Sequence, residues 1–303
     1  MSSHVAVLMG GWSAEREVSL VTGRACAVAL RDEGYRVSEL DVGHDLAQQL
    51  VATAPDVAFN ALHGRWGEDG CVQGVLEVLG LPYTHSGVRA SALAMHKPTA
   101  REVFIQNGIP CPQGVVESIE RINAQDVLER PYVVKPVSEG STYGVRIVQP
   151  GDNQPPIGAD WSFGEDALAE RYIPGRELSV AVMDGRALGV VEIRPHSGFY
   201  DYDAKYTDGK AEHTMPAAVH EQIYASAMQL AEQAHRALAC RGVTRADFRY
   251  DDTGGEPGGL YMLEINTQPG MTPLSLVPEI AAYTGMSFGA LVRWMVEDAS
   301  CQR

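Results

Sequence analysis

Two apolar segments near the C-terminus, joined by a turn rich in Asp and Gly, constrain the fold most strongly. Residues 243–250 and 260–265 have the pattern of antiparallel strands in a hairpin. Side chains alternate across a strand, so Glu264 and Asn266 should share one face, and Asp247 should reach it from the other strand. A lone acidic residue in a strand is more often an ordinary edge carboxylate, but three oxygen donors placed by one hairpin predict a Mg²⁺ site.

The charge balance limits the kinds of partner. The chain has 303 residues and a formal net charge of −15, which argues against a nucleic acid or an anionic membrane as partner. A nucleotide remains compatible, because local lysines and Mg²⁺ can hold phosphates. The five cysteines are odd in number and form no Cys-x-x-Cys pair, which indicates reduced thiols. With no apolar run of membrane-spanning length and no secretory signal, we expect a cytoplasmic protein.

The first third of the chain alternates predicted strands with predicted helices. Strands at 5–9, 36–41 and 57–62 are separated by helical periodicity, which indicates an α/β unit with parallel strands. We expect three domains, with an α/β substrate-binding domain over 1–86, a small α+β domain over 87–173 and an α+β catalytic domain with an antiparallel sheet over 174–303. The polar stretch 197–212 in the third domain has the length and composition of a lid loop.

A glycine-rich segment, residues 10–15, follows the first predicted strand and opens the first helix. Glycines allow a ligand to approach the backbone, and a helix N-terminus attracts anions. The segment lacks the G-x-G-x-x-G pattern, so a nicotinamide-dependent oxidoreductase fits poorly, and a plain structural turn is the competing interpretation. Glu15 at the helix start should stay ionised and could hold a substrate ammonium group, although it could also be a simple helix-terminal charge.

A second glycine-rich segment, residues 63–70, follows the third predicted strand. The carboxyl ends of strands in an open α/β sheet are where ligands bind, so His63 is a candidate contact. A lone histidine is more often structural, and His63 does not identify a function.

Residues 135–144 combine a lysine at the end of an apolar strand with a turn of Gly, Ser and Thr between two strands. The backbone amides of such a turn can bind phosphate oxygens while Lys135 neutralises charge; the alternative is a flexible hairpin with a surface lysine. Further along, Glu170, Arg171, Ile173 and Glu177 could form a strand edge that pairs with a purine and accepts from ribose hydroxyls. An exposed charged edge strand is the alternative there.

Taken together, these motifs resemble the ATP-grasp superfamily, and more closely the D-alanine–D-alanine ligases of bacterial cell-wall synthesis. The resemblance covers nearly the whole chain and rests on residues 10–19, 61–65, 67–70, 84–94, the Lys135 turn, Phe-Tyr-Asp-Tyr-Asp-Ala-Lys-Tyr at 199–206, Arg245 with Asp247, and 264–277.

The resemblance implies an ATP-dependent ligase that joins two D-alanines through an acyl phosphate, with ATP as co-substrate. It implies two Mg²⁺ ions, replaceable by Mn²⁺, at Asp247, Glu264 and Asn266. Lys97, Lys135 and Lys205 would contact phosphates, while Glu170, Arg171, Ile173 and Glu177 would line the adenine and ribose pocket. Glu15 would hold the ammonium group of the first D-alanine, with His63 nearby. Ser141 and Tyr206 would form hydrogen bonds with Glu15. Arg245 and the Gly270 amide would stabilise the oxyanion, and Ser275 and Leu276 would bind the second carboxylate.

The sequence departs from the family pattern at His96, Thr142-Tyr143, Arg171 and Gln268, none of which removes a group that the chemistry requires. Two alternatives stay open beside the ligase. One is a ligase that makes a D-alanyl-D-lactate depsipeptide, which Tyr206 argues against. The other is a nucleotide sensor with an inactive site, which the intact Asp247, Glu264, Asn266 and Arg245 argue against. We also expect a homodimer.

Overall fold

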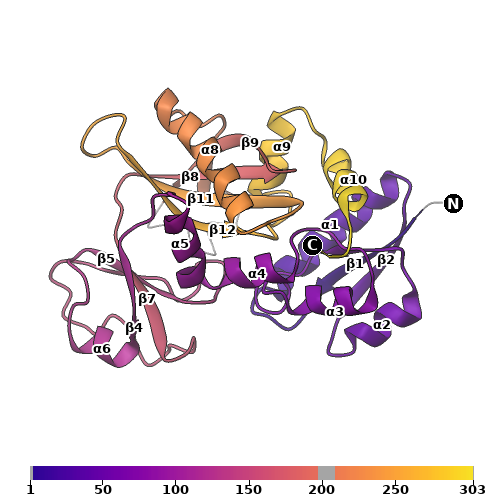
Figure 1. Ribbon diagram of the computed structural model, residues 1–303, viewed down its shortest axis with the longest axis horizontal. Helices are drawn as coiled ribbons and strands as arrows, with labels where there is room; N and C mark the ends of the chain where they lie inside the picture. The colour runs from indigo at the N-terminus through magenta and orange to yellow at the C-terminus, as the bar shows by residue number, and fades with distance from the viewer. Residues whose placement is uncertain (1–2, 197–208, 303) are drawn as a thin grey trace.

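The computed structural model describes residues 3–196 and 209–302, whose strands form three separate sheets (Figure 1). A parallel sheet lies at one end of the molecule, a four-stranded antiparallel sheet at the other, and a five-stranded sheet lies above and between them. The expected mixed α/β architecture, with a parallel sheet in the N-terminal domain and an antiparallel sheet in the C-terminal domain, is confirmed. The domain limits proposed at 86/87 and 173/174 stay predictions.

The N-terminal unit is a parallel sheet in the order β2 (Arg36–Val42), β1 (His4–Gly10), β3 (Val57–Asn60). Every residue of β1 is buried, because this central strand is covered on both faces. Helices α1 (Arg16–Asp32) and α3 (Cys71–Leu79) follow the periodicity read from the sequence. The short helix α2 (Leu46–Thr53) was not anticipated, since only Leu46 and Leu50 are buried and its apolar pattern is brief.

Two helices, α4 (Val88–Met95) and α5 (Lys97–Gln106), lead to the four-stranded sheet. Its order is β4 (Gly114–Ser118), β7 (Asp166–Arg171), β5 (Tyr132–Pro136), β6 (Arg146–Val148), and all its pairs are antiparallel. Strand β4 and the short helix α6 (Ile119–Ala124) were not anticipated. Lys135 lies near the end of β5, and Ser141 lies in the middle of the turn between β5 and β6.

The five-stranded sheet has the order β10 (Ala211–Thr214), β9 (Arg186–Pro195), β8 (Arg176–Met183), β11 (Val243–Asp251), β12 (Gly259–Asn266). The antiparallel pairing of β11 with β12 confirms the predicted hairpin. The prediction of a loop through residue 212 was wrong at its end, because residues 211–214 pair with β9 as an edge strand. Backbone pairing at an edge needs no apolar pattern, so a polar sequence conceals it.

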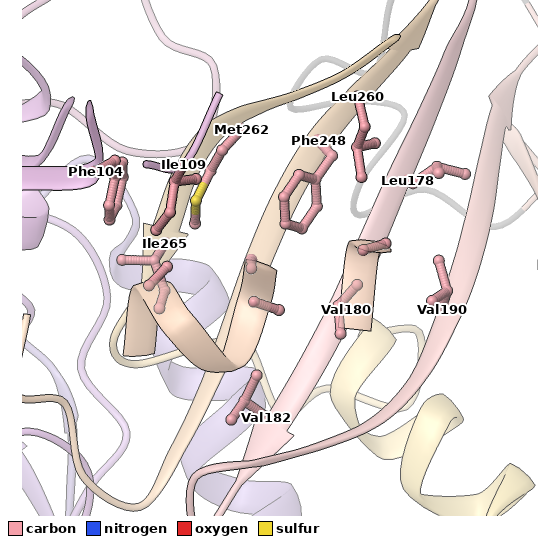
Figure 2. Close-up of a cluster of buried hydrophobic side chains, with 14 of the residues drawn as sticks. Phe104, Ile109, Leu178, Val180, Val182, Val190, Phe248, Leu260, Met262 and Ile265 are labelled. Carbon is pink, nitrogen blue, oxygen red and sulfur yellow. The ribbon is translucent and has the colours of Figure 1, made fainter. Parts of the chain in front are cut away.

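Helix α8 (Glu221–Ala237) covers one face of this sheet, and α9 (Leu276–Tyr283) and α10 (Phe288–Asp298) connect it to the N-terminal unit. Figure 2 shows the core on the α8 side, where Phe248 lies beside Leu178 and Val180 lies beside Val190 on neighbouring strands. Phe104 and Ile109, from α5 and the turn after it, pack beside Met262 and Ile265 of β12. These contacts bury the face of β12 that carries Met262 and Ile265, so the opposite face, which carries Glu264, is backed by a fixed core.

Within the described ranges, no helix combines the length and apolar character needed to cross a bilayer.

Candidate functional site

The hairpin β11–β12 brings the predicted oxygen donors together. Asp247 lies directly across from Glu264, and Arg245 lies across from Asn266. The Asp247 carboxylate accepts from Arg245 Nε at 2.9 Å and Nη2 at 2.7 Å, and from the Ser179 hydroxyl at 2.6 Å. Lys97 Nζ lies 2.9 Å from Glu264 Oε2. The carboxylates of Asp247 and Glu264 therefore lie side by side, and each has a cationic side chain next to it.

This donor set fits Mg²⁺ by its chemistry. Asp247 is buried and Glu264 is partly exposed. Asn266 Oδ1 accepts from the backbone N–H of Gln268 at 2.8 Å, which leaves its second lone pair for a metal ion. In the part of the chain that is described, no three His, Cys, Asp or Glu side chains gather as a metal site, so the amide oxygen of Asn266 would be the third donor. Hard oxygen ligands of this kind suit Mg²⁺, which leaves several positions to water and phosphate.

A large cleft opens between the four-stranded and five-stranded sheets, with a volume of about 670 Å³. It reaches from the Lys135 turn to Glu264, and its lining includes every predicted adenine, ribose and phosphate contact among the described residues: Lys97, Lys135, Glu170, Arg171, Ile173 and Glu177. A volume of this size is typical of small-molecule sites.

Lys135 and Glu170 form a nearly buried ion pair inside the large cleft. Lys135 Nζ lies 2.5 Å from Glu170 Oε2, and the two side chains are 9% and 5% exposed. Arg101 Nε lies 3.8 Å from the other oxygen of Glu170. Glu170 therefore has two cationic side chains beside it, and a bound phosphate would compete with its carboxylate for the Lys135 ammonium.

The other predicted base and ribose contacts lie at the end of β7, on the linker between β7 and β8, and at the start of β8. Arg171 ends β7 with its guanidinium 5.3 Å from the Tyr261 ring centroid. Ile173 is buried and its carbonyl accepts from Arg249 Nε at 3.1 Å. Glu177 Oε2 lies 3.8 Å from Arg249 Nη1.

A smaller cavity of about 60 Å³ adjoins the large cleft and is lined by five of the predicted amino-acid and oxyanion contacts. Its lining includes Glu15, His63, Ser141, Arg245 and Gly270. The Ser141 hydroxyl donates to Glu15 Oε2, which confirms the predicted contact between residues that are 126 positions apart in the sequence.

His63 is buried between two polar side chains. Its Nε2 lies 2.9 Å from the Thr22 hydroxyl and its Nδ1 lies 3.1 Å from Glu68 Oε1. Thr22 and Glu68 fix the ring orientation, so His63 presents a rigid wall to the cavity.

The turn after β5 is tied down by Lys97, whose ammonium donates to the Glu139 carbonyl at 2.7 Å. Ser141 and Thr142 have φ of +49° and +66°, a region that non-glycine residues seldom adopt. Burial raises the pKa of the Glu139 carboxyl above its usual value, while the positive charges of Arg65 and Lys97 oppose the rise. Glu139 lines both the large cleft and the small cavity.

Ser275 and Leu276 lie at the start of α9, beside Gly270. The Ser275 hydroxyl accepts from the Thr272 amide at 2.9 Å, and a Cβ on Gly270 would lie 2.8 Å from it. The Leu276 side chain is buried in the core, so only its backbone amide at the helix N-terminus could meet a ligand. Lys205 and Tyr206 lie outside the described residues.

The sequence interpretation missed Asn60 as a support of the site. Asn60 Nδ2 donates to Gln268 Oε1 at 2.6 Å, and Gln268 Nε2 donates to the Leu62 carbonyl. This buried contact joins the end of β3 to the loop after β12. The departure from the family pattern at Gln268 was the only signal, and it did not reveal the partner.

An aromatic stack, also missed, lies at the end of the parallel sheet. The Trp12 ring lies 4.4 Å from that of His44 and 5.9 Å from that of Trp66, and the Arg65 guanidinium lies 4.8 Å from the Trp66 ring. Trp12 and Trp66 line a small recess together with His63.

Comparisons with known proteins agree with this geometry. The model of the D-ala D-ala ligase C-terminus matches residues 112–297, and that of the D-ala D-ala ligase N-terminus matches residues 40–86. A D-alanine–D-alanine ligase of Parvibaculum lavamentivorans is 59% identical, with 100% of this chain and 99% of the relative covered. That of Methylocella silvestris is 58% identical, with both chains fully covered at 100%.

Solved structures agree as well. A D-alanine–D-alanine ligase from Bacillus anthracis superposes with a TM-score of 0.81 at 29% identity, covering 98% of this chain and 97% of that one. A structure of that enzyme complexed with ATP gives a TM-score of 0.79 at 28% identity, with 98% and 97% covered. With a family model spanning more than half of its residues and relatives matching along its whole length, this chain belongs to the D-alanine–D-alanine ligase family.

Proposed function

We propose that this protein joins two D-alanines into D-alanyl-D-alanine and converts ATP to ADP and phosphate. One observation carries the proposal. The large cleft and the small cavity meet, and Lys97, Glu139 and Glu264 line both of them. A γ-phosphate held from the large cleft would reach a carboxylate held in the small cavity. The names of the relatives support D-alanine as the substrate.

The nucleotide would lie in the large cleft, with its base against residues 171–173 and its ribose near Glu177. Lys97 and Lys135 would bind phosphates, and the buried position of Lys135 makes its charge strongly felt there. Lys205 of the undescribed stretch is proposed as a third phosphate contact. Asp247, Glu264 and Asn266 would hold Mg²⁺, with two ions per site and Mn²⁺ as a substitute, and the metal would neutralise charge on the transferred phosphoryl group.

The first D-alanine would bind in the small cavity with its ammonium group on Glu15. Ser141 fixes the orientation of the Glu15 carboxylate, and His63 lies in the cavity wall. Phosphorylation converts the D-alanine carboxylate, a poor electrophile, into an acyl phosphate. The amine of the second D-alanine then attacks the carbonyl carbon and phosphate leaves.

Arg245 and the Gly270 amide would stabilise the oxyanion formed in that attack, a contribution worth about 3–4 kcal/mol per donor. The second D-alanine would place its carboxylate at Ser275 and the N-terminus of α9, where backbone amides and the helix dipole favour negative charge. Acyl phosphates hydrolyse in water, so the site needs a cover. We assign that role to the segment around Tyr206, with the Tyr206 hydroxyl near Ser141 and Glu15.

A cytoplasmic location and a homodimeric state complete the proposal. The five cysteines are free thiols, which suits a reducing compartment. A second copy of this chain could cover the exposed apolar side chains Val21 and Val28 on α1, which are 49% and 56% exposed.

Phosphate release from ATP tests the function, with D-alanine, L-alanine or D-lactate offered separately and the product identified by mass. We expect release and dipeptide only with D-alanine. ATP binding without phosphate release, whatever the amino acid, would favour a nucleotide sensor, and an ester product with D-lactate would favour the depsipeptide ligase.

Charge removal at the metal site gives a second test. Glu264→Gln should cut turnover by orders of magnitude while the unfolding temperature changes little, because it removes a negative charge from the proposed Mg²⁺ site that the remaining ligands replace poorly. The exposed Glu102→Gln on α5 is the matched control and should leave turnover unchanged. Near-normal turnover of the Glu264 variant at limiting Mg²⁺ would show that the metal lies elsewhere.

A further inference from the structure

The chain passes from the four-stranded sheet to the five-stranded sheet through residues 172–175, between the end of β7 and the start of β8. This short linker runs against β11. A Cβ on Gly175 would lie 2.2 Å from the Tyr250 carbonyl oxygen, and Gly175 has φ +88°. Only glycine fits this close approach in that conformation, so the linker is pressed onto the strand that carries Asp247.

One side chain of β11 holds this linker. Arg249 Nε donates to the Ile173 carbonyl at 3.1 Å, and Nη2 donates to the Gly175 carbonyl at 2.8 Å. Its third nitrogen, Nη1, lies 3.8 Å from Glu177 Oε2. A planar guanidinium can make these contacts at once, because its donors form a rigid fork. Pro174, between the two acceptor residues, has no backbone N–H and so adds no second donor to this linker.

Arg249 lies on the same face of β11 as Arg245 and Asp247, since alternate residues share a face and all three pair in one continuous register with β8. It lines the large cleft, and its side chain is 19% exposed. Arg249 bonds the linker, which the proposed function places against the base, through the carbonyls of Ile173 and Gly175. It also lies near Glu177, which the proposed function places near the ribose. The inference below rests on that proposed function.

The geometry points to Arg249 as a positioning residue for the nucleotide: it fixes the linker and Glu177 relative to the metal-bearing strand and so sets the affinity for ATP. It acts through Ile173, Gly175 and Glu177. Among the described residues, Arg249 does not line the small cavity, so its effect should fall on ATP binding and spare D-alanine binding.

The test compares Arg249→Met and Arg249→Lys with wild type, using calorimetric binding of ATP with Mg²⁺ and without D-alanine. Arg249→Met should raise the Kd for ATP about tenfold or more, where tenfold equals about 1.4 kcal/mol. Arg249→Lys should recover part of the affinity, since an ammonium group can replace only one arm of the fork. Steady-state kinetics should show a higher KM for ATP, with kcat within about threefold and the KM for D-alanine within about twofold of wild type.

The control for the lost charge is Arg186→Met, at the exposed start of β9 in the same sheet, which should leave the Kd for ATP unchanged. A second route to the same displacement keeps Arg249 intact. Gly175→Ala should push the linker off β11 and raise the Kd for ATP in the same direction. Gly108 has φ +74°, and nothing lies within 4 Å of an added Cβ. Gly108→Ala therefore introduces the backbone strain without the clash and should leave the Kd for ATP unchanged.

An unchanged Kd for ATP in Arg249→Met would overturn the inference, and so would equal rises in the KM values of ATP and D-alanine with a parallel fall in unfolding temperature. Failure of the proposed function has a different signature: wild-type protein itself would bind no ATP or release no phosphate with D-alanine.

Discussion

Replacing Gln268 with alanine should destabilise the protein strongly, because Gln268 links the N-terminal unit to the loop that follows β12. The side chain is 1% exposed and bonds two buried groups, the Asn60 amide at 2.6 Å and the Leu62 carbonyl. In the variant both groups lose a partner in a site closed to bulk solvent. Each unsatisfied group costs about 1–3 kcal/mol, so roughly 4 kcal/mol is expected for the pair.

The corresponding change in unfolding temperature follows from chain length. An unfolding entropy of about 2.1 cal/mol/K per residue gives about 0.6 kcal/mol/K for 303 residues that unfold together. A loss of 4 kcal/mol then lowers the Tm by about 6 °C. Circular dichroism or dye-based melting at fixed protein concentration measures it, with the exposed Gln48→Ala on α2 as the control that should stay within about 1 °C.

A double-mutant cycle with Asn60→Ala separates this contact from general loosening of the core. Asn60 also donates to the Gly67 carbonyl at 3.1 Å, so its own replacement costs more than one bond. If the two side chains stabilise each other, the double variant should be less destabilised than the sum of the singles by about 1 kcal/mol or more. A Tm drop in Gln268→Ala no larger than in Gln48→Ala, or strict additivity in the cycle, would refute the reasoning.

Three further predictions concern single contacts. Ser141→Ala removes the hydroxyl that orients Glu15 and should raise the KM for D-alanine about tenfold at saturating ATP; an unchanged KM would mean that Ser141 is not a latch on that carboxylate. His213 Nδ1 lies 2.7 Å from Glu279 Oε2 and ties β10 to α9, so His213→Asn and Glu279→Gln should each lower the Tm while the double variant is no worse than the worse single; full additivity in melting would contradict the pairing. Burial lowers the pKa of His235 from 6.5 to about 4, so between these pH values the unfolded chain binds a proton that the folded chain does not. The free energy of unfolding should therefore fall by up to about 3 kcal/mol as the pH drops from 6.5 to about 4. Urea titrations should show a smaller pH dependence in His235→Gln.

The residues that hold the site on regular strands could be predicted from sequence. Alternation along β12 placed Glu264 and Asn266 on one face, and the hairpin turn placed Asp247 opposite, as the register shows. The strand and helix alternation of the first third predicted the parallel sheet, because a strand buried on both faces is apolar throughout. Local pattern was sufficient wherever burial and periodicity coincide.

The contacts that depend on tertiary packing could not be predicted from local pattern. Nothing in the sequence near Gln268 indicates that Asn60 lies beside it, since 208 residues separate the two. Strand β10 is short and polar, so its pairing with β9 leaves no apolar signature. The contact of Arg249 with the linker could not be predicted either. Its acceptors are backbone carbonyls, which every residue has, so the contact leaves no pattern in the sequence of the linker.

The aromatic stack of Trp12, His44 and Trp66 gives the protein a built-in optical reporter. The chain has four tryptophans, and two of them flank the recess that His63 also lines. Indoles whose ring centres lie 5.9 Å apart share their excited state, so emission depends on how the two glycine-rich segments are arranged. Trp161, stacked edge-on against Phe163, and Trp294 on α10 supply a background that phenylalanine substitutions can remove. Stopped-flow fluorescence could then follow arrival of the first amino acid in unlabelled protein, separately from events in the large cleft.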